Sequence, residues 1–388
     1  MTDLVHCSPL LFVMECKIIL IRSINLKRYL TANVTSLLPV ERLQVRYPSR
    51  KSHVRRQRAI PPTVPFPCED AVSWGRSPQR PTSVHRLRPG DIDVVAAIGD
   101  SLVAGSGALE EFALGAFVEY RGVSWCAGGD ASWREYLTLP NILKEFNPNL
   151  RGYSTGTGEW LTRNAQFNVA FPVASDEDAL KQIDIENDWK MITVFIGAND
   201  LCSASCLNPV SWSPAAHAKK LAKALDYLHK HLPRTIVNLV PVLGNTYLSK
   251  FLAGDFCEGP CNCSDVLIQI ESGRYDTRED FTVLVQPFMR LFNAPLPPTR
   301  PLPLVIHQSY ITHDCFHFSQ KGHALAANLL WNNLLEPVGN KSDNVPPVLL
   351  REFRCPTRRA PFLFTARNSQ EFLRSGKQDG ADDVYLEN

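Results

Sequence analysis

The chain has 388 residues, of which 44% are apolar and 21% charged, so it can form one large domain with tails or two small ones. The net charge of +2 hides an asymmetry, because residues 1–60 hold 11 Lys or Arg against 3 Asp or Glu. No basic face with interleaved aromatic residues recurs in the acidic remainder, which argues against a nucleic-acid partner. No run of 18 apolar residues occurs, so we expect no transmembrane segment.

The N-terminal part of the sequence predicts two segments outside the main domain. Residues 1–66 are strongly basic and end in a proline-rich stretch, which is typical of a disordered leader. Charged residues interrupt its apolar runs, so it contains no convincing signal peptide. Residues 67–90 are rich in Ser, Pro and Arg and predict a connector.

Residues 91–340 predict the main domain, because strand and helix patterns alternate along them. Four apolar runs are typical of buried parallel strands: 94–98, 192–196, 235–240 and 281–285. Apolar residues at helical spacing predict helices over 214–231 and 324–335. This alternation predicts an α/β domain whose parallel sheet is flanked by helices. Residues 341–388 are expected to form an irregular C-terminal segment.

The 11 cysteines leave their chemistry open between disulfides, free thiols and a metal site. Two clusters, at 202–206 and 257–263, lie in polar sequence without a His at ligand spacing. This pattern favours disulfides over zinc, and we expect no metal. Three N-glycosylation triplets begin at Asn33, Asn262 and Asn340, which suits a secreted glycoprotein, although such triplets also arise by chance.

Three short motifs carry the candidate chemistry. They are Gly99-Asp100-Ser101-Leu102 after the first predicted strand, Gly197-Ala198-Asn199-Asp200 after the second, and Asp314-Cys315-Phe316-His317 before the last helix. Functional residues of an open parallel sheet gather at the carboxyl ends of its strands, so we expect the three motifs on one rim. Each motif alone also fits a turn, a helix cap or a surface pair, but their order and placement together are restrictive.

The residue types in these motifs suit acyl transfer by a serine nucleophile. A serine hydroxyl needs a base within hydrogen-bond reach, and His317 is the candidate base for Ser101. Asp314, three residues before His317, is placed to hold the imidazole ring. The backbone N–H of Ser101 and the side-chain amide of Asn199 are candidate donors to an oxyanion. His323 competes with His317, and we expect it to pack or cap at the start of the last helix.

The three motifs resemble three of the four sequence blocks of the GDSL, or SGNH, serine hydrolases. Their surroundings resemble the phospholipase B type of that family, from about Pro67 to about Asn368 and not in the leader. The matching segments are Val84 to Pro89, Tyr120 to Gly122, Leu139 to Leu143, Phe146 to Pro148, Pro233 to Thr235, Arg274 to Arg278 and Asp314 to Ser319.

This resemblance implies a flavodoxin-like three-layer sandwich of the SGNH-hydrolase type. It implies a serine ester hydrolase that cleaves acyl esters of phospholipids or lysophospholipids through an acyl-enzyme, with no metal or organic cofactor. It assigns catalysis to Ser101, Asp314 and His317, and the oxyanion hole to Ser101 and Asn199. It also implies an extracellular, secreted protein that meets its phospholipid or other acyl-ester substrate at a membrane surface.

The second block of the family pattern is altered in this sequence. Asn168-Val169-Ala170 is followed by Phe171-Pro172-Val173, and Val173 stands about where family members have a glycine. A branched side chain removes the backbone freedom of a glycine, and Pro172 has no N–H to donate. The alternative function is therefore a catalytically weak or inactive relative that binds lipid or a protein partner.

Overall fold

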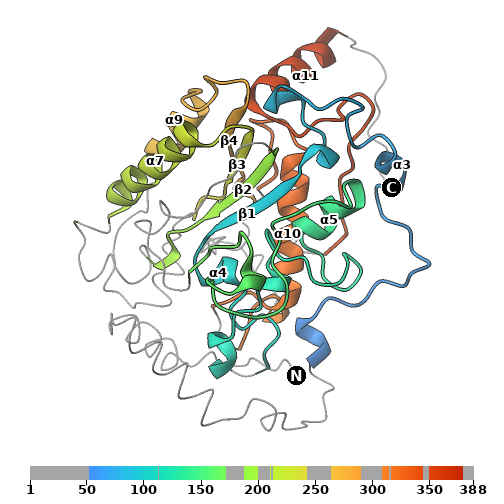
Figure 1. Ribbon diagram of the computed structural model, residues 1–388, viewed down its shortest axis with the longest axis vertical. Helices are drawn as coiled ribbons and strands as arrows, with labels where there is room; N and C mark the ends of the chain where they lie inside the picture. The colour runs from blue at the N-terminus through green and yellow to red at the C-terminus, as the bar shows by residue number, and fades with distance from the viewer. Residues whose placement is uncertain are drawn as a thin grey trace, which may run out of the picture.

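A parallel β-sheet forms the centre of the computed structural model of the chain (Figure 1). The structure describes residues 52–111, 113–171, 188–199, 210, 213–242, 264–289, 308–313, 316–343 and 349–378. Four strands lie in the order β1-β2-β3-β4 and span Val94–Gly99, Lys190–Phe195, Thr235–Leu239 and Phe281–Val285. The four predicted apolar runs form these strands, and all of their pairings are parallel, which confirms the predicted fold class.

Strand β1 is hydrogen-bonded along both of its edges. On one side it pairs with β2 over its whole length. On the other side lies the irregular segment 151–171, which receives a hydrogen bond from Ala97 N to Phe167 O and gives one from Phe171 N to Gly99 O, both at 3.0 Å. With this discontinuous member beside β1, the sheet has the strand order of a flavodoxin-like fold. This edge is not predictable from an apolar run in the sequence, because its backbone pairs with β1 only at isolated positions.

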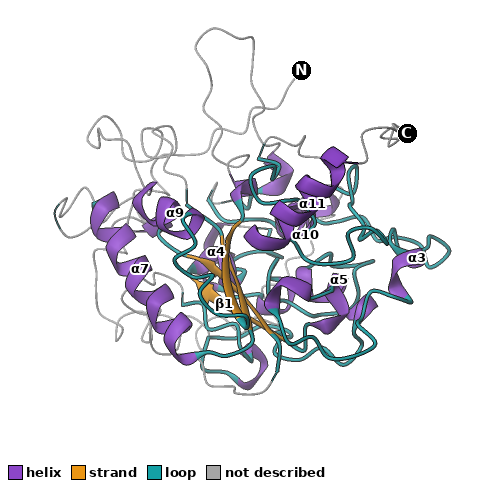
Figure 2. Ribbon diagram, turned by 90° about the horizontal axis from the view of Figure 1, so that it is seen from above, coloured by secondary structure: helices purple, strands orange, loops and turns teal. Residues whose placement is uncertain are grey.

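Helices cover both faces of the sheet, so the fold has three layers (Figure 2). Helices α7 (Pro214–His231) and α9 (Ser264–Glu271) lie on one face. Helices α5 (Leu139–Phe146) and α10 (Gln320–Leu334) lie on the other. Successive strand residues enter opposite hydrophobic cores, as Ile192 does on the α7 side and Met191 on the α10 side. Burial on both faces explains why each strand is a continuous apolar run in the sequence.

Side-chain caps determine where the long helices begin. Thr138, Ser213 and Ser319 precede α5, α7 and α10, and each hydroxyl accepts a hydrogen bond from a backbone N–H of the first turn. Because of its Ser319 cap, α10 begins four residues before the predicted start at 324. The remaining helices are α3 (Glu69–Val72), α4 (Ser101–Ala104) and α11 (Ala366–Gln378). Single 3-10 turns span Ser52–Arg55, Val84–Arg86, Pro89–Asp91, Ala113–Phe117, Arg121–Val123, Arg163–Ala165 and Gln308–Tyr310.

The described end of the predicted leader packs against the domain. Gln57 is 8% exposed, and its side-chain amide donates to Trp133 O and accepts from Leu137 N. Phe66 lies in an aromatic cluster with Trp133 and Phe146. Residues 1–51 of the predicted leader lie outside the described residues.

The C-terminal segment, expected to be irregular, contains helix α11. Thr365 and Asn368 form a reciprocal cap at its start, because Thr365 N donates to Asn368 Oδ1 and Asn368 N donates to Thr365 Oγ1. The helix packs through few apolar residues, among them Phe372 against Phe364. Ala366, Phe372 and Leu373 are the apolar side chains of this mostly polar helix, too few for apolar spacing alone to predict it.

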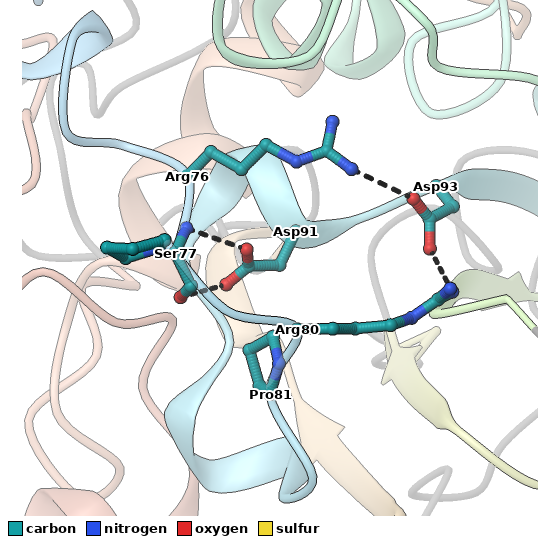
Figure 3. A pocket seen from close by; sticks show the side chains of 7 residues that line it. Arg76, Ser77, Arg80, Pro81, Asp91 and Asp93 are labelled. Carbon is teal, nitrogen blue, oxygen red and sulfur yellow. Dashed lines mark hydrogen bonds and ion pairs between the residues drawn. The ribbon is translucent and has the colours of Figure 1, made fainter.

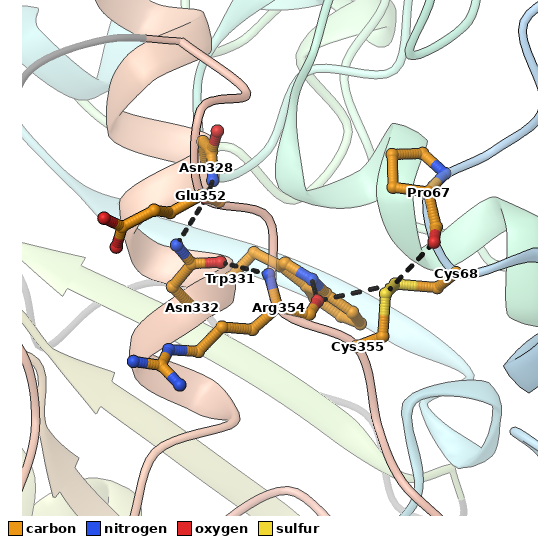
Figure 4. The surroundings of a disulfide bond; sticks show 8 residues. All are labelled: Pro67, Cys68, Asn328, Trp331, Asn332, Glu352, Arg354 and Cys355. Carbon is orange, nitrogen blue, oxygen red and sulfur yellow. Dashed lines mark hydrogen bonds between the residues drawn. A yellow bond between two sulfur atoms is a disulfide. The ribbon is translucent and has the colours of Figure 1, made fainter. Parts of the chain in front are cut away.

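A disulfide between Cys68 and Cys355 joins the predicted connector to the C-terminal segment (Figure 4). Backbone around Cys355 lies along α10, where Trp331 Nε1 donates to Arg354 O at 2.7 Å and Arg354 N donates to Asn332 Oδ1 at 2.9 Å. The bond closes a loop of 287 residues. The predicted cysteine clusters at 202–206 and 257–263 lie outside the described residues.

Replacing both Cys68 and Cys355 by Ser is expected to lower the melting temperature. In the chain-entropy account a cross-link over so long a loop contributes up to about 5 kcal/mol, so the loss should be several degrees or more. Thermal unfolding without reductant compares the double variant with the unchanged chain, and equal melting temperatures would contradict the prediction.

Candidate active site

Ser101 lies where the backbone leaves β1 at the carboxyl end of the sheet. It is the first residue of α4 and is 8% exposed. The Asp100 side chain caps this helix by accepting a hydrogen bond from Leu102 N at 3.0 Å. A Cβ on Gly99 would lie 2.4 Å from a methyl carbon of Val103 and 2.6 Å from Phe195 O, so the turn has no room for a side chain. This fit explains the glycine before the motif.

Asn199 lies at the carboxyl end of the neighbouring strand. It follows β2 and is half-buried. The chain turns at Gly197, whose φ of +123° is a conformation that L side chains rarely adopt. A Cβ there would also lie 2.5 Å from the His217 ring of α7. Because β1 and β2 are adjacent and parallel, Ser101 and Asn199 lie on the same rim, as predicted.

His317 lies on a loop that leads into α10 and is 5% exposed. Its carbonyl oxygen accepts hydrogen bonds from Thr312 N at 2.8 Å and Thr312 Oγ1 at 3.3 Å. An antiparallel bridge between Ile311 and Phe318 closes the loop. Asp314, the predicted partner of the His317 ring, lies outside the described residues.

Contacts from α10 bring the His317 loop to the Ser101 turn. Gln320 N, in the first turn of α10, donates to Ala108 O at 2.8 Å. Trp125 bridges the two parts, because its Nε1 donates to Leu102 O and its backbone N donates to His323 Nδ1. The charge of His317 acts on the Asp100 carboxyl beside Ser101. No hydrogen bond joins Ser101 Oγ to His317 Nε2 in this structure, and such contacts often form only with substrate bound.

Burial shifts the pKa values of two titratable groups near the rim, Asp100 and His323, in opposite directions. Burial raises the pKa of Asp100 to about 6, against the opposing influences of the Leu102 N–H and the His317 charge. Burial, with a smaller contribution from the charge of His317, lowers the pKa of His323 to about 3. His323 is therefore neutral and packed, with Nδ1 accepting from Trp125, which agrees with the expectation that it is not the base.

The second block is held beside β1 by a buried arginine. Arg121 is 0% exposed and donates to Asn168 O at 2.8 Å, to Ala170 O at 2.6 Å and to Gly158 O at 2.7 Å. Its charge is balanced by Glu119 at 2.7 Å. Val173, at the expected glycine position, lies outside the described residues. Arg121 and Glu119 therefore hold the backbone of the second block as far as Phe171, the last described residue before the expected glycine position.

Residues 55 and 57, assigned to the leader by the sequence analysis, brace the His317 loop. Arg55 Nε donates to Ile311 O at 2.9 Å, and Gln57 N donates to Gln320 Oε1 at 2.5 Å. Composition alone suggested a disordered segment, and no local pattern marks these long-range contacts. The Gln57 side chain bonds to backbone of residues 133 and 137, which are distant in sequence, so only the folded structure reveals the contact.

A separate cavity of about 240 Å³ lies at the amino end of β1, opposite to the end that carries Ser101, and its lining is drawn in Figure 3. Its charges compensate one another, because Arg76 and Arg80 both contact Asp93 and the Asp91 carboxylate accepts from Ser77. It is not part of the Ser101 rim.

Among the described residues, no three His, Cys, Asp or Glu side chains are grouped to hold a metal ion, and no helix is long and apolar enough to cross a membrane.

Comparisons with known proteins agree with this arrangement. A sequence model of the GDSL-like lipase/acylhydrolase family matches residues 95–330, which include the Ser101, Asn199 and His317 motifs. The human protein named "Phospholipase B1, membrane-associated" is 39% identical and its mouse counterpart 40% identical, each over 78% of this chain. The chain spans 23% of the length of these relatives.

Replacing Arg121 by Met is expected to destabilise the fold strongly. Removal of one partner leaves the Glu119 charge buried and three backbone carbonyls without their donor, which costs about 3–5 kcal/mol. The matched control is Arg274→Met, since Arg274 pairs with Asp226 at an exposed site and its loss should cost less than about 1 kcal/mol. Urea unfolding measures both changes, and similar losses in the two variants would refute the structural role of Arg121.

Replacing Arg55 by Met is expected to loosen the loop that carries His317. Loss of a charged hydrogen bond of about 1.5 kcal/mol should speed amide exchange at Thr312 and Ser319 about tenfold. Hydrogen exchange measured by NMR tests this, with Arg58→Met as the control because Arg58 is exposed. Unchanged protection of Thr312 in the Arg55 variant would show that the contact does not hold the loop.

Proposed function

Because the chain belongs to the GDSL-like lipase/acylhydrolase family, we propose that it is a serine ester hydrolase with Ser101 as its nucleophile. The proposal is supported above all by the meeting of the first two motifs at the ends of adjacent strands, with Trp125 joining the start of α10, beside the His317 loop, to the Ser101 turn. A nucleophile, an amide donor and a base on one rim are the parts that acyl transfer requires.

In the proposed first step, Ser101 Oγ attacks the ester carbonyl carbon while its proton passes to His317 Nε2. Collapse of the tetrahedral intermediate breaks the bond to the alcohol, whose oxygen takes the proton back from His317. Water then attacks the acyl-enzyme by the same path and releases the carboxylic acid. Asp314 would accept a hydrogen bond from His317 Nδ1 and fix the tautomer that leaves Nε2 able to accept the proton.

The oxyanion would be stabilised by the Ser101 backbone N–H and the Asn199 side chain. Ser101 begins α4, so its N–H has no partner within that helix. Asn199 approaches from the adjacent strand end. A third donor from the second block is not assigned, since the described part of that block ends at Phe171.

We further propose that the substrates are acyl esters of phospholipids or lysophospholipids, met at a membrane surface outside the cell. The substrate class rests on similarity to membrane-associated phospholipase B1 proteins, of which this chain spans only part. The Cys68–Cys355 disulfide supports an oxidising compartment. The exposed Asn340 in one of the three glycosylation triplets is compatible with a secreted glycoprotein.

A second candidate function is a weakly active or inactive relative that binds lipid or a protein partner. The substitution of Val173 for the family glycine favours it, because one oxyanion donor typically contributes about 10²–10³ to turnover. The two functions differ in whether Ser101 is activated, and a covalent probe of the nucleophile separates them.

A fluorophosphonate probe is expected to label the purified chain at Ser101. Labelling and the burst of p-nitrophenol from a p-nitrophenyl ester should both vanish in Ser101→Ala, because no other hydroxyl is activated by His317. Asn199→Ala should lower kcat about 10²–10³-fold while the chain stays folded. The matched control is Ser272→Ala, a change of an exposed serine after α9 that should leave labelling intact. A folded wild-type chain that resists the probe would favour the binding function.

A further inference from the structure

The carboxyl group of Asp100 is buried beside Ser101 and has no role in the steps above. Asp100 is 1% exposed; its Oδ1 accepts from Leu102 N, and its Oδ2 is buried without a hydrogen-bond partner in the described part of the chain. A buried carboxylate is unfavourable unless opposite charge or dipoles compensate it. The structure must therefore offer the Asp100 carboxylate some compensation besides its single hydrogen bond from Leu102 N.

Capping of α4 does not explain why the residue is charged. Asn, Ser and Thr cap a helix about as well as Asp, and they avoid the desolvation of an ion. Helix α4 has only four residues, so its dipole offers little compensation. The charge, rather than the hydrogen bond to Leu102, is the feature that needs a function.

The loop that carries His317 lies beside the turn that carries Asp100, because Trp125 donates from Nε1 to Leu102 O and from its backbone N to His323 Nδ1. Burial raises the Asp100 pKa to about 6, and the Leu102 N–H and then the positive charge of His317 oppose this rise. The interaction is reciprocal, so the ionised Asp100 carboxylate also favours the protonated form of His317. Among the other described titratable groups, His323 of α10 also feels the charge of His317 but stays neutral. Asp314, on the His317 loop itself, lies outside the described residues.

We propose that Asp100 is a positioning residue for the reaction, whose carboxylate balances the positive charge that His317 gains when it removes the Ser101 proton. The inference rests on the proposed function. Proton transfer from Ser101 Oγ to His317 Nε2 creates an imidazolium and, at the carbonyl, an oxyanion, with no change in net charge. Asp100 stabilises the imidazolium from the Ser101 side of the site, through space, while Asp314 is proposed to hold the ring from the loop side.

The test compares Asp100→Asn with the unchanged chain, because Asn keeps the cap and removes the charge. NMR titration of the imidazole should show the pKa of His317 lowered by about one unit. The acidic limb of kcat/KM against pH should move to lower pH by the same amount, and kcat on the plateau should fall about tenfold. Asp226→Asn, at an exposed ion pair on α7, is the matched control and should change none of these.

The raised pKa of Asp100 also predicts how the stability of Asp100→Asn, relative to wild type, changes with pH. The Asp100 pKa of about 6 in the folded chain exceeds its usual value of 3.8, so the folded state binds this proton more tightly than the unfolded state. The stability that the folded chain gains from binding this proton is fully present below about pH 4 and is lost as the pH rises through 6. The melting temperature of Asp100→Asn relative to wild type should therefore be more favourable at pH 7.5 than at pH 4.5. This comparison also verifies that the variant folds.

The outcomes separate the inference from the proposed function. A wild-type chain that folds but resists the fluorophosphonate probe overturns the proposed function and the inference with it. A labelled wild-type chain whose Asp100→Asn variant keeps the His317 pKa and the acidic limb unmoved overturns the inference alone. Asp100→Ser, which also caps without charge, repeats the test if the Asn variant does not fold. Lower His317 pKa and a shifted limb in either variant support the charge-balancing role.

Discussion

Double-sided hydrogen bonding of β1 is the constraint on which the site depends. Because β2 lies on one edge and segment 151–171 on the other, the backbone can leave the sheet only at the carboxyl end of the strand. The exit has no space for a side chain at Gly99, so the chain turns sharply into α4 and presents Ser101 on the rim. The same sheet sets Asn199 one strand away. The relative placement of nucleophile and amide is therefore a consequence of strand pairing, not of loop conformation.

The sequence predicted the parts of the fold that follow from local chemistry. Buried parallel strands are continuous apolar runs, and glycines mark the two turns that carry Ser101 and Asn199, so both could be recognised. The edge beside β1 could not be recognised, because its pairing is discontinuous and depends on Arg121 binding carbonyls 47 and 49 residues further on. Helix α11 is mostly polar and begins at a cap formed by Thr365 and Asn368, so the spacing of apolar residues could not reveal it.

Long-range contacts account for the parts of the site and its support that the sequence did not predict. Arg55 and Gln57 lie in a basic, proline-rich stretch, yet they bond to the loop and helix that carry His317. The Cys68–Cys355 bond likewise joins positions 287 residues apart, a pairing that spacing cannot reveal. Arg55 and Gln57 join the first described residues to α10 and its preceding loop, and Arg354, next to the disulfide, is hydrogen-bonded to α10. The segments outside the sheet thus support the element that positions the base.

A crystal structure of the chain after reaction with a fluorophosphonate tests the central claim most directly. The account predicts phosphorus bonded to Ser101 Oγ, with the phosphoryl oxygen within about 3 Å of both Ser101 N and Asn199 Nδ2 and with His317 on the opposite side of the adduct. Phosphorus on another residue, or a phosphoryl oxygen turned away from Asn199, would contradict it.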